Sequence, residues 1–199
     1  GSGWGVVLDY GFMDLGADRT VGAGGIVDAS VRQGILEALA VRRNLLGNEA
    51  PEVAETLNQL AYVLSRKGDY AGAEPLMREA LDIRRAVFGD SHPDVAESLE
   101  DLGLNIFDQG DLDQSISLLQ QAVAMRRETH GELHPSLSDA VSNLAYVLNA
   151  AGDLEGAEAR LLEVLEMQRR LYDDESPAVA TALSNVAYIY HVQGKYDAA

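Results

Sequence analysis

Residues 51–70 read PEVAETLNQLAYVLSRKGDY, and three copies of this segment follow along the chain. The copies are residues 93–112 (PDVAESLEDLGLNIFDQGDL), 135–154 (PSLSDAVSNLAYVLNAAGDL) and 177–196 (PAVATALSNVAYIYHVQGKY). The opening prolines stand 42 residues apart, at Pro51, Pro93, Pro135 and Pro177. The glycines keep the same step, at Gly68, Gly110, Gly152 and Gly194. A fixed period of this length indicates stacked supersecondary units that bury a continuous core.

Each unit is predicted to form two helices. Proline suits the first position of a helix, because its missing N–H is not needed there. The apolar residues after Pro51 form one helical stripe, made of Val53, Leu57, Leu60, Ala61 and Leu64. Gly68 ends that helix, since glycine tolerates a left-handed backbone. The pattern predicts helices over residues 31–46, 52–66, 70–87, 94–108, 112–129, 136–150, 154–171 and 178–193.

The second helix of each unit has its own signals. An aspartate after the glycine is predicted to cap it, at Asp69, Asp111 and Asp153. Paired cations close it and complement the negative end of the helix dipole, at Arg84-Arg85, Arg126-Arg127 and Arg169-Arg170. Small residues recur in the first helices, at Ala61, Gly103, Ala145 and Ala187. We expect these small residues to let two helices approach closely.

These motifs resemble the tetratricopeptide repeat, in the long form found in kinesin light chains and many bacterial multidomain proteins. The matching elements are L-N-x-L-A, G-D-Y-x-x-A, the paired-basic helix end, and G-x-x-H-P-x-V-A, seen best at residues 89–96 and 131–135. The resemblance covers about residues 31–199. It implies an all-α, right-handed superhelical solenoid of antiparallel helix pairs. It also implies a concave groove, lined by the first helices, that binds a peptide or partner protein.

The two ends of the chain differ from the repeat. Residues 31–47 align with a second helix that has no first helix, so residues 1–29 are expected to be an irregular glycine-rich segment or a divergent cap. The array then occupies residues 30–199, with units near 51–92, 93–134 and 135–176 and a truncated unit at 177–199. The last unit stops early, which indicates a piece of a longer protein. It is expected to expose Val179, Leu183, Val186, Ala187 and Tyr190 and to favour end-to-end self-association through the C-terminal helix.

Composition excludes several classes of partner. The formal net charge of −17 repels nucleic acid and anionic membranes, because binding there depends on neutralising phosphates. No apolar run is long enough to span a bilayer. The absence of cysteine excludes disulfides and thiolate sites and fits a reducing compartment, so we expect a cytoplasmic protein. The acidity serves either solubility or a preference for basic partners.

No motif predicts catalysis, a cofactor or a metal. Residues 22–27 (GAGGIV) contain glycines without the third glycine or the strand–helix context of a dinucleotide loop. His130 and His134 are four apart, but Gly131 and Pro135 place them in a loop, where a zinc helix cannot form. The carboxylates lie along solvated helix faces rather than in a pocket that would raise one pKa. The chain is therefore expected to be a non-enzymatic segment.

The candidate site is the groove side of the first helices. Spacing of three and four places four residues of each unit there: Glu55, Asn58, Tyr62 and Ser65; Glu97, Glu100, Leu104 and Phe107; Asp139, Ser142, Tyr146 and Asn149; Thr181, Ser184, Tyr188 and His191. The tyrosines either pack between neighbouring helices or line a peptide groove. Asn58 matches the asparagine with which kinesin light chains grip a peptide backbone, whereas Glu100, Ser142 and Ser184 do not. Glu97 and Asp139 oppose an acidic ligand, so a basic peptide is the expected partner.

Three functions remain open at this point. The first is a protein-interaction scaffold, within a larger protein, that binds a peptide in its groove. The second is a regulatory or sensor segment of a multidomain enzyme whose catalytic domain lies outside this chain. The third is a self-assembling structural array.

Overall fold

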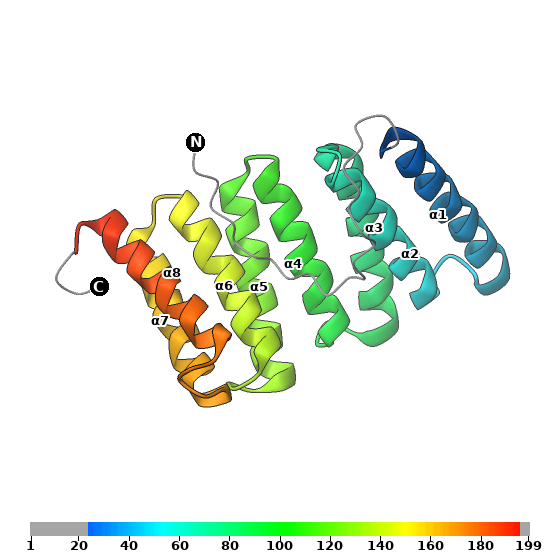
Figure 1. Cartoon of the computed structure of the whole chain (residues 1–199). Coiled ribbons are helices and arrows are strands. Elements are labelled where there is room, and N and C mark those ends of the chain that lie inside the picture. Colours follow the sequence, from blue (N-terminus) through cyan, green and yellow to red (C-terminus); the bar gives the residue numbers. More distant parts are fainter. Residues whose placement is uncertain (1–23, 196–199) are drawn as a thin grey trace.

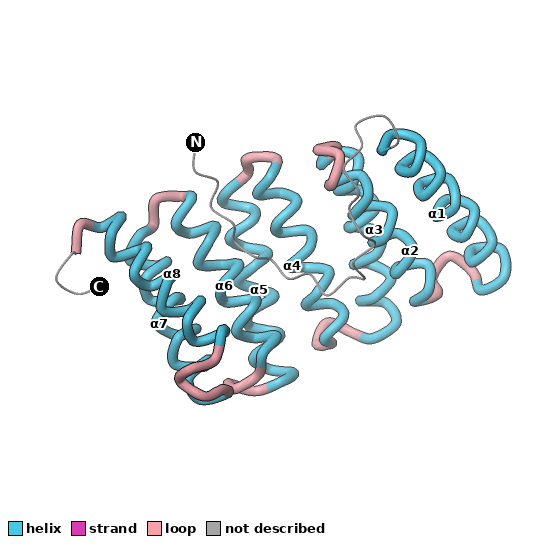
Figure 2. Tube along the Cα trace, in the orientation of Figure 1, coloured by secondary structure: helices cyan, strands magenta, loops and turns pink. Residues whose placement is uncertain are grey.

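Eight α-helices and no strand make up residues 24–195, the part of the chain that this computed structural model describes (Figure 1). The first helices of the units are α2 (Pro51–Ser65), α4 (Pro93–Asp108), α6 (Pro135–Ala150) and α8 (Pro177–Gln193). The second helices are α1 (Gly24–Leu46), α3 (Tyr70–Phe88), α5 (Leu112–His130) and α7 (Leu154–Leu171). Each helix packs on the one before and the one after it, which gives an elongated stack (Figure 2). The predicted all-α repeat solenoid is confirmed.

The helix ends form as the repeated residues predict. Proline begins every first helix, and His92 Nδ1 and His134 Nδ1 accept hydrogen bonds from the backbone N–H of Asp94 and Ser136, both at 3.2 Å. The recurrent histidines are therefore N-caps. The aspartate caps are confirmed too, because Asp69, Asp111 and Asp153 each accept from the backbone N–H three residues ahead, at 2.9–3.0 Å.

Most predicted boundaries agree with the structure to within one or two residues, but the start of α1 does not. Residues 24–29 belong to this helix, which begins seven residues before the predicted position. The glycines suggested irregular backbone, yet glycine weakens a helix chiefly in its interior, and two of them form the first turn. The irregular alternative is thus wrong for residues 24–29. Residues 1–23 lie outside the described part of the chain.

The core extends through the stack in three apolar clusters, which include Leu57, Leu99 and Leu144. The small residues at the repeated position serve close packing in three units: Ala61 and Ala145 are buried, and a Cβ on Gly103 would lie 3.0 Å from Leu119 Cγ on α5. Ala187 is exposed instead, because no described helix packs on that side of α8.

The C-terminal helix exposes only part of the predicted apolar strip. Leu183 and Ala187 are exposed, as expected, whereas Tyr190 is half-buried against the core cluster rather than exposed. Val179 and Val186 are buried, because they belong to the same cluster as α6 and α7. The exposed strip is therefore narrower than the sequence predicts. Within residues 24–195 no helix combines the length and the apolar character that crossing a bilayer requires.

The first helices lie on the inner side of the stack. Beyond helices that follow one another in the chain, the closest packing joins α4 directly to α6, two first helices. In a curved array the elements on the inner side come closest to one another. We call the exposed side of α2, α4, α6 and α8 the first-helix face.

Candidate functional site

Three rows of side chains run across the first-helix face, because each unit presents the same three positions one turn apart. The first row holds Glu55, Glu97, Asp139 and Thr181. The second row, four residues on, holds Gln59, Asp101, Asn143 and Asn185. The third row, three residues further, holds Tyr62, Leu104, Tyr146 and Tyr188. The first and third rows contain predicted site residues, whereas the second row was not predicted.

The third row supplies exposed aromatic surface. Tyr62, Tyr146 and Tyr188 are 42%, 45% and 36% exposed. The ring of Tyr146 also meets the ring of Phe107 edge-on, with centroids 5.2 Å apart. Tyr146 therefore packs against α4, as one interpretation predicts, and still leaves nearly half of its surface exposed, whereas its place in a peptide groove stays a prediction. Exposed aromatic rings of this kind provide contact area at low entropic cost.

Arginines neutralise most of the predicted acidic stripe. Ion pairs join Glu55 to Arg42 at 3.3 Å and Glu97 to Arg84 at 3.3 Å, each from the preceding helix. Glu100 is buried rather than exposed, because Arg126 Nε on α5 lies over it and donates to Oε1 at 2.8 Å. The prediction that Glu100 lies open on the groove is wrong for this reason.

The paired cations do more than complement a helix dipole. Arg84 Nη1 donates to the backbone oxygen of Asp94 and to Ser98 Oγ, both at 2.9 Å. One unit earlier, Arg42 makes the same contacts to Glu52 O at 2.9 Å and Thr56 Oγ1 at 2.6 Å. The third unit has Ala140 in place of the hydroxyl residue, and its arginine turns to Glu100 instead.

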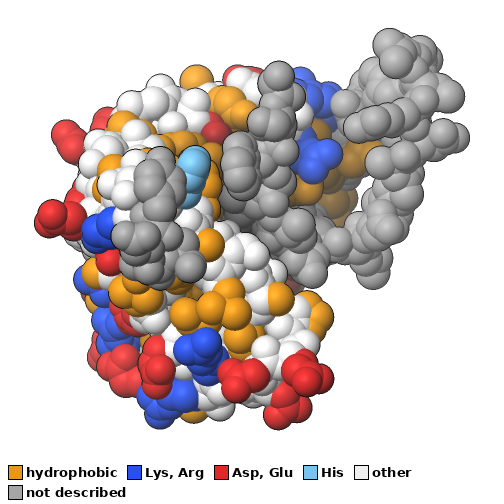
Figure 3. Space-filling view, turned by 60° about the vertical axis from the view of Figure 1, so that its left-hand side comes forward, with side chains coloured by type: hydrophobic (Ala, Val, Ile, Leu, Met, Phe, Trp, Pro, Cys, Tyr) orange, Lys and Arg blue, Asp and Glu red, His pale blue; other side chains and the backbone are white. Residues whose placement is uncertain are grey.

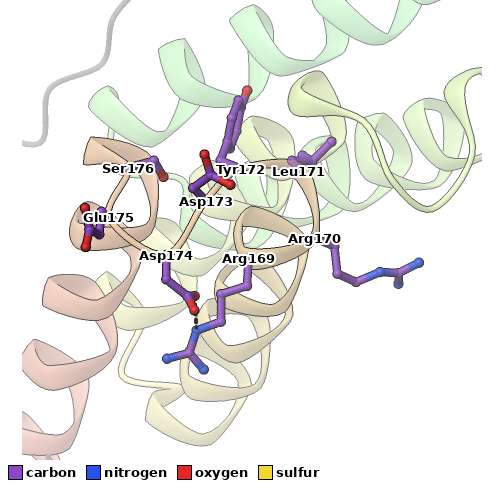
Figure 4. Close-up of a pocket in the computed structure, with 8 residues that line it drawn as sticks. All are labelled: Arg169, Arg170, Leu171, Tyr172, Asp173, Asp174, Glu175 and Ser176. Carbon is purple, nitrogen blue, oxygen red and sulfur yellow. Dashed lines mark ion pairs between the residues drawn. The ribbon is translucent and has the colours of Figure 1, made fainter.

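The last unit departs from the paired-basic pattern. In the 42-residue register Gln168, not Arg169, matches Arg84, and its amide donates to Ser138 Oγ at 2.8 Å. The loop that follows also lacks the glycine and histidine of the α3–α4 and α5–α6 loops, and Ser176 caps α8. Residues 169–176 line an open pocket there (Figure 4), and Arg169 pairs with Asp174 at 3.7 Å. None of the predicted site residues lines this pocket.

The second row carries side-chain amides that have no internal partner. Gln59, Asn143 and Asn185 are half-buried, and within residues 24–195 none of them makes a hydrogen bond. A carboxamide presents both a donor and an acceptor, which matches the needs of a peptide group. The signal was present in the sequence as a row of amide residues at a fixed step. It was missed because the row lies beside the core stripe on the helix.

Some of the remaining predicted site residues are exposed, and others make hydrogen bonds within the chain. Asn58 keeps one buried carbonyl oxygen without a partner. Three hydroxyls donate to carbonyls of their own helices at 2.8–2.9 Å, those of Ser142, Thr181 and Ser184. Ser65 accepts from Asn105 at 3.1 Å, Asn149 is half-buried, and Asp139 and His191 are exposed. The serines are therefore occupied in supporting the helices.

Asp101 is the exception in the second row. The carboxyl group is half-buried on α4, and no ion pair or hydrogen bond to it occurs within the described residues. Burial, reinforced by the like charges of Glu97 and Glu100 and opposed by Arg84 and Arg126, raises the pKa of Asp101 to about 7. Burial also raises the pKa of Glu100, although Arg126 opposes the shift.

Across residues 24–195, no group of three histidine, aspartate or glutamate side chains has the arrangement that holds a metal ion. The rings of His130 and His134 lie tilted at 33° to each other with centroids 4.3 Å apart, and His134 caps α6. The arrangement offers contact surface, peptide-like hydrogen-bonding groups and charge.

Comparison with known proteins agrees with this geometry. A family model described as tetratricopeptide repeat matches residues 35–86, 52–128 and 136–199. Nearly identical TPR-like repeats of a Podosopora anserina protein named for kinesin light chain superpose with a TM-score of 0.73 at 21% identity, covering 86% of each chain. No curated protein matches the sequence significantly.

Two further solved structures share the fold. BtubC (BKLC) from P. vanneervenii gives a TM-score of 0.77 at 17% identity, over 86% of this chain and 68% of that one. The apo form of RapI gives 0.73 at 14% identity, over 87% of this chain and 46% of that one. At such identities the likeness concerns the fold alone.

Proposed function

Because this chain belongs to the tetratricopeptide repeat family, we propose that it is a protein-interaction scaffold whose first-helix face binds an extended segment of a partner protein. Stacked repeats of this kind create extended concave binding surfaces, and the side chains on those surfaces determine the partner. The expected ligand is therefore a polypeptide rather than a small molecule.

The side-chain amides of the second row carry the proposal. Gln59, Asn143 and Asn185 make no side-chain hydrogen bond to any described residue, and the exposed tyrosines of the third row lie one turn further along the same helices. Free amides can pair with the N–H and C=O groups of an extended chain, and the rings can cover its side chains. Such a surface recognises main chain and bulky side chains together.

The charge of the face favours a basic segment, within limits set by the ion pairs. Glu55 and Glu97 are already paired with arginines, so their field is weaker than the sequence suggested. Asp139 remains exposed on α6. We infer modest affinity with a strong dependence on salt, because exposed charges are screened.

A display experiment tests the proposed function. A library of random twelve-residue peptides on phage is panned against the whole chain, and the enriched peptides are measured by fluorescence polarisation. Tyr146→Ala should weaken binding by about tenfold or more, in line with the loss of an aromatic anchor. Tyr172→Ala is the matched control, because this tyrosine is 43% exposed in the α7–α8 loop, away from the face.

Thermal melts of both variants accompany the binding measurements, since Tyr146 also packs on Phe107. Equal losses in the two variants, with Tyr146→Ala still folded, would contradict a binding role for the first-helix face. Failure to enrich any peptide would contradict the proposed function as well.

Self-association is a second candidate, favoured by one observation on α8. Leu183 is 42% exposed, whereas Leu57, Leu99 and Val141 at the same position of the other units are fully buried. Figure 3, turned so that the α7–α8 end comes forward, shows apolar side chains in patches among charged ones. A second helix from this polypeptide or from another copy would cover Leu183. Light scattering at several protein concentrations tests whether another copy covers Leu183. Leu183→Glu should abolish any increase of the apparent mass with concentration.

A regulatory role next to a catalytic domain is compatible with the same face. In that arrangement the bound segment would belong to the enzyme it regulates. The peptide experiment above applies unchanged.

A further inference from the structure

Asp101 interrupts the row of side-chain amides with an ionisable carboxyl group. The other units carry the neutral Gln59, Asn143 and Asn185 at this position. All four side chains are half-buried on the same face, so the row changes chemistry at one place only. The α4 part of the first-helix face therefore differs from the rest of the second row by one carboxyl group.

The cations that act on Asp101 are already committed to other groups. Arg84 Nη1 donates to Asp94 O and Ser98 Oγ, both at 2.9 Å. Arg126 Nε donates to Glu100 Oε1 at 2.8 Å. Arg84 and Arg126 both favour the ionised form of Asp101, but the like charges of Glu97 and Glu100 act on it more strongly, so the internal arginines compensate its charge only in part.

A half-buried carboxylate whose charge is only partly compensated is unfavourable, and an arriving cation would reduce that cost. The surroundings suit a long cationic side chain. Leu104 lies one turn along α4 for its methylene stem, and the exposed ring of Tyr146 on the adjacent α6 can accept a cation–π contact.

We propose that Asp101 selects a lysine or arginine side chain of the bound segment and thereby fixes the register of that segment on the face. The inference rests on the proposed function and adds the chemistry of one ligand side chain. Elsewhere along the row the amides contact main chain, which is the same for any sequence. Asp101 then supplies the sequence-specific contact.

The test uses the whole chain and the twelve-residue peptide library. The parent chain should enrich peptides with lysine or arginine at one fixed position. Asp101→Asn, which restores the residue found at Asn143 and Asn185, should remove that preference and weaken the best parent-selected peptide by about tenfold or more, as for the loss of a hydrogen bond to a charged group. Asp82→Asn on α3, exposed and away from the face, should change neither.

A double-mutant cycle assigns the contact. Norleucine in place of the selected lysine should weaken binding to the parent but not to Asp101→Asn. Binding to the parent should also tighten as pH rises from 6 to 8, since a cation favours the ionised form of Asp101, and this dependence should vanish in Asp101→Asn.

The outcomes separate the two proposals. Peptides that depend on Tyr146 but show no cation preference, or keep their preference on Asp101→Asn, would overturn the role of Asp101 and leave the proposed function standing. A library that yields no binder would overturn both.

Discussion

The guanidinium of Arg84 at the end of α3 donates a buried hydrogen bond to Ser98 Oγ on α4, at 2.9 Å. The same nitrogen also reaches Asp94 O at 2.9 Å and Glu97 at 3.3 Å. One side chain thus connects the second helix of one unit to the first helix of the next. Arg42 repeats the arrangement with Thr56 at 2.6 Å.

This connection predicts a large effect of Arg84→Met on stability. Methionine keeps much of the packing volume but leaves Ser98 Oγ and Asp94 O without their donor, so the free energy of unfolding should fall by about 1.5–3 kcal/mol. Arg170→Met is the control, because Arg170 is exposed and makes no ion pair or hydrogen bond in the described residues. Urea denaturation followed by circular dichroism measures both. Coincident midpoints for the two variants would rule out the connection as a source of stability.

The loop glycines give a second prediction. Gly110 has φ +93° with nothing within 4 Å of an added Cβ, so Gly110→Ala should cost about 1–2 kcal/mol through backbone strain alone. Gly34 lies inside α1, also with free space around it, and Gly34→Ala should stabilise by about 0.5–1 kcal/mol. Opposite shifts in melting temperature are expected. A stabilising Gly110→Ala would show that the turn does not require the positive φ.

Signals that act on the local backbone made the fold predictable. Proline at the start of a first helix and glycine with positive φ at its end depend on neighbouring residues only, so the helix ends could be located from their 42-residue step. The cap at Asp69 is local in the same sense. The start of α1 was missed because glycines in a first turn give no such signal.

Contacts between helices were harder to predict. The sequence assigned Arg84 to the helix dipole, since its partner on the next helix is known only once the two helices are packed. Glu100 was placed on the open face because a helical wheel cannot show that Arg126 of α5 covers it. Asp101 was missed because it follows Glu100 in the sequence and so lies outside the stripe of residues that the spacing of three and four assigned to the groove.

The buried carboxyl of Asp101 predicts a pH dependence of stability. Its pKa is raised from 3.8 to about 7 in the folded chain. Between these two pH values the folded state therefore holds a proton that the unfolded state has released. The free energy of unfolding should therefore fall as pH rises from about 4 to about 7. Asp101→Asn removes this loss, and its melting temperature should exceed that of the parent by more at pH 8 than at pH 5.5.

Asp82→Asn serves as the matched control for that measurement, because Asp82 is exposed on α3. Its difference from the parent should be small and equal at the two pH values. If the advantage of Asp101→Asn were the same at pH 5.5 and pH 8, the raised pKa would be wrong.

The exposed carboxylate of Asp139 gives the last prediction, which concerns steering rather than register. Asp139 lies on α6 in the first row of the face, where Glu55 and Glu97 are held by arginines and the fourth residue is Thr181. Charge on an open face acts mainly on the rate of association. For a lysine-containing peptide selected from the library, Asp139→Lys should lower the association rate constant several-fold at low salt and leave dissociation nearly unchanged. The effect should fade near 0.5 M salt, because the screening length is then only a few ångströms. Asp82→Lys makes the same change in net charge on α3 and should slow association much less. Stopped-flow fluorescence measures both rates, and equal slowing by the two variants would mean that overall charge, not the first-helix face, guides the peptide.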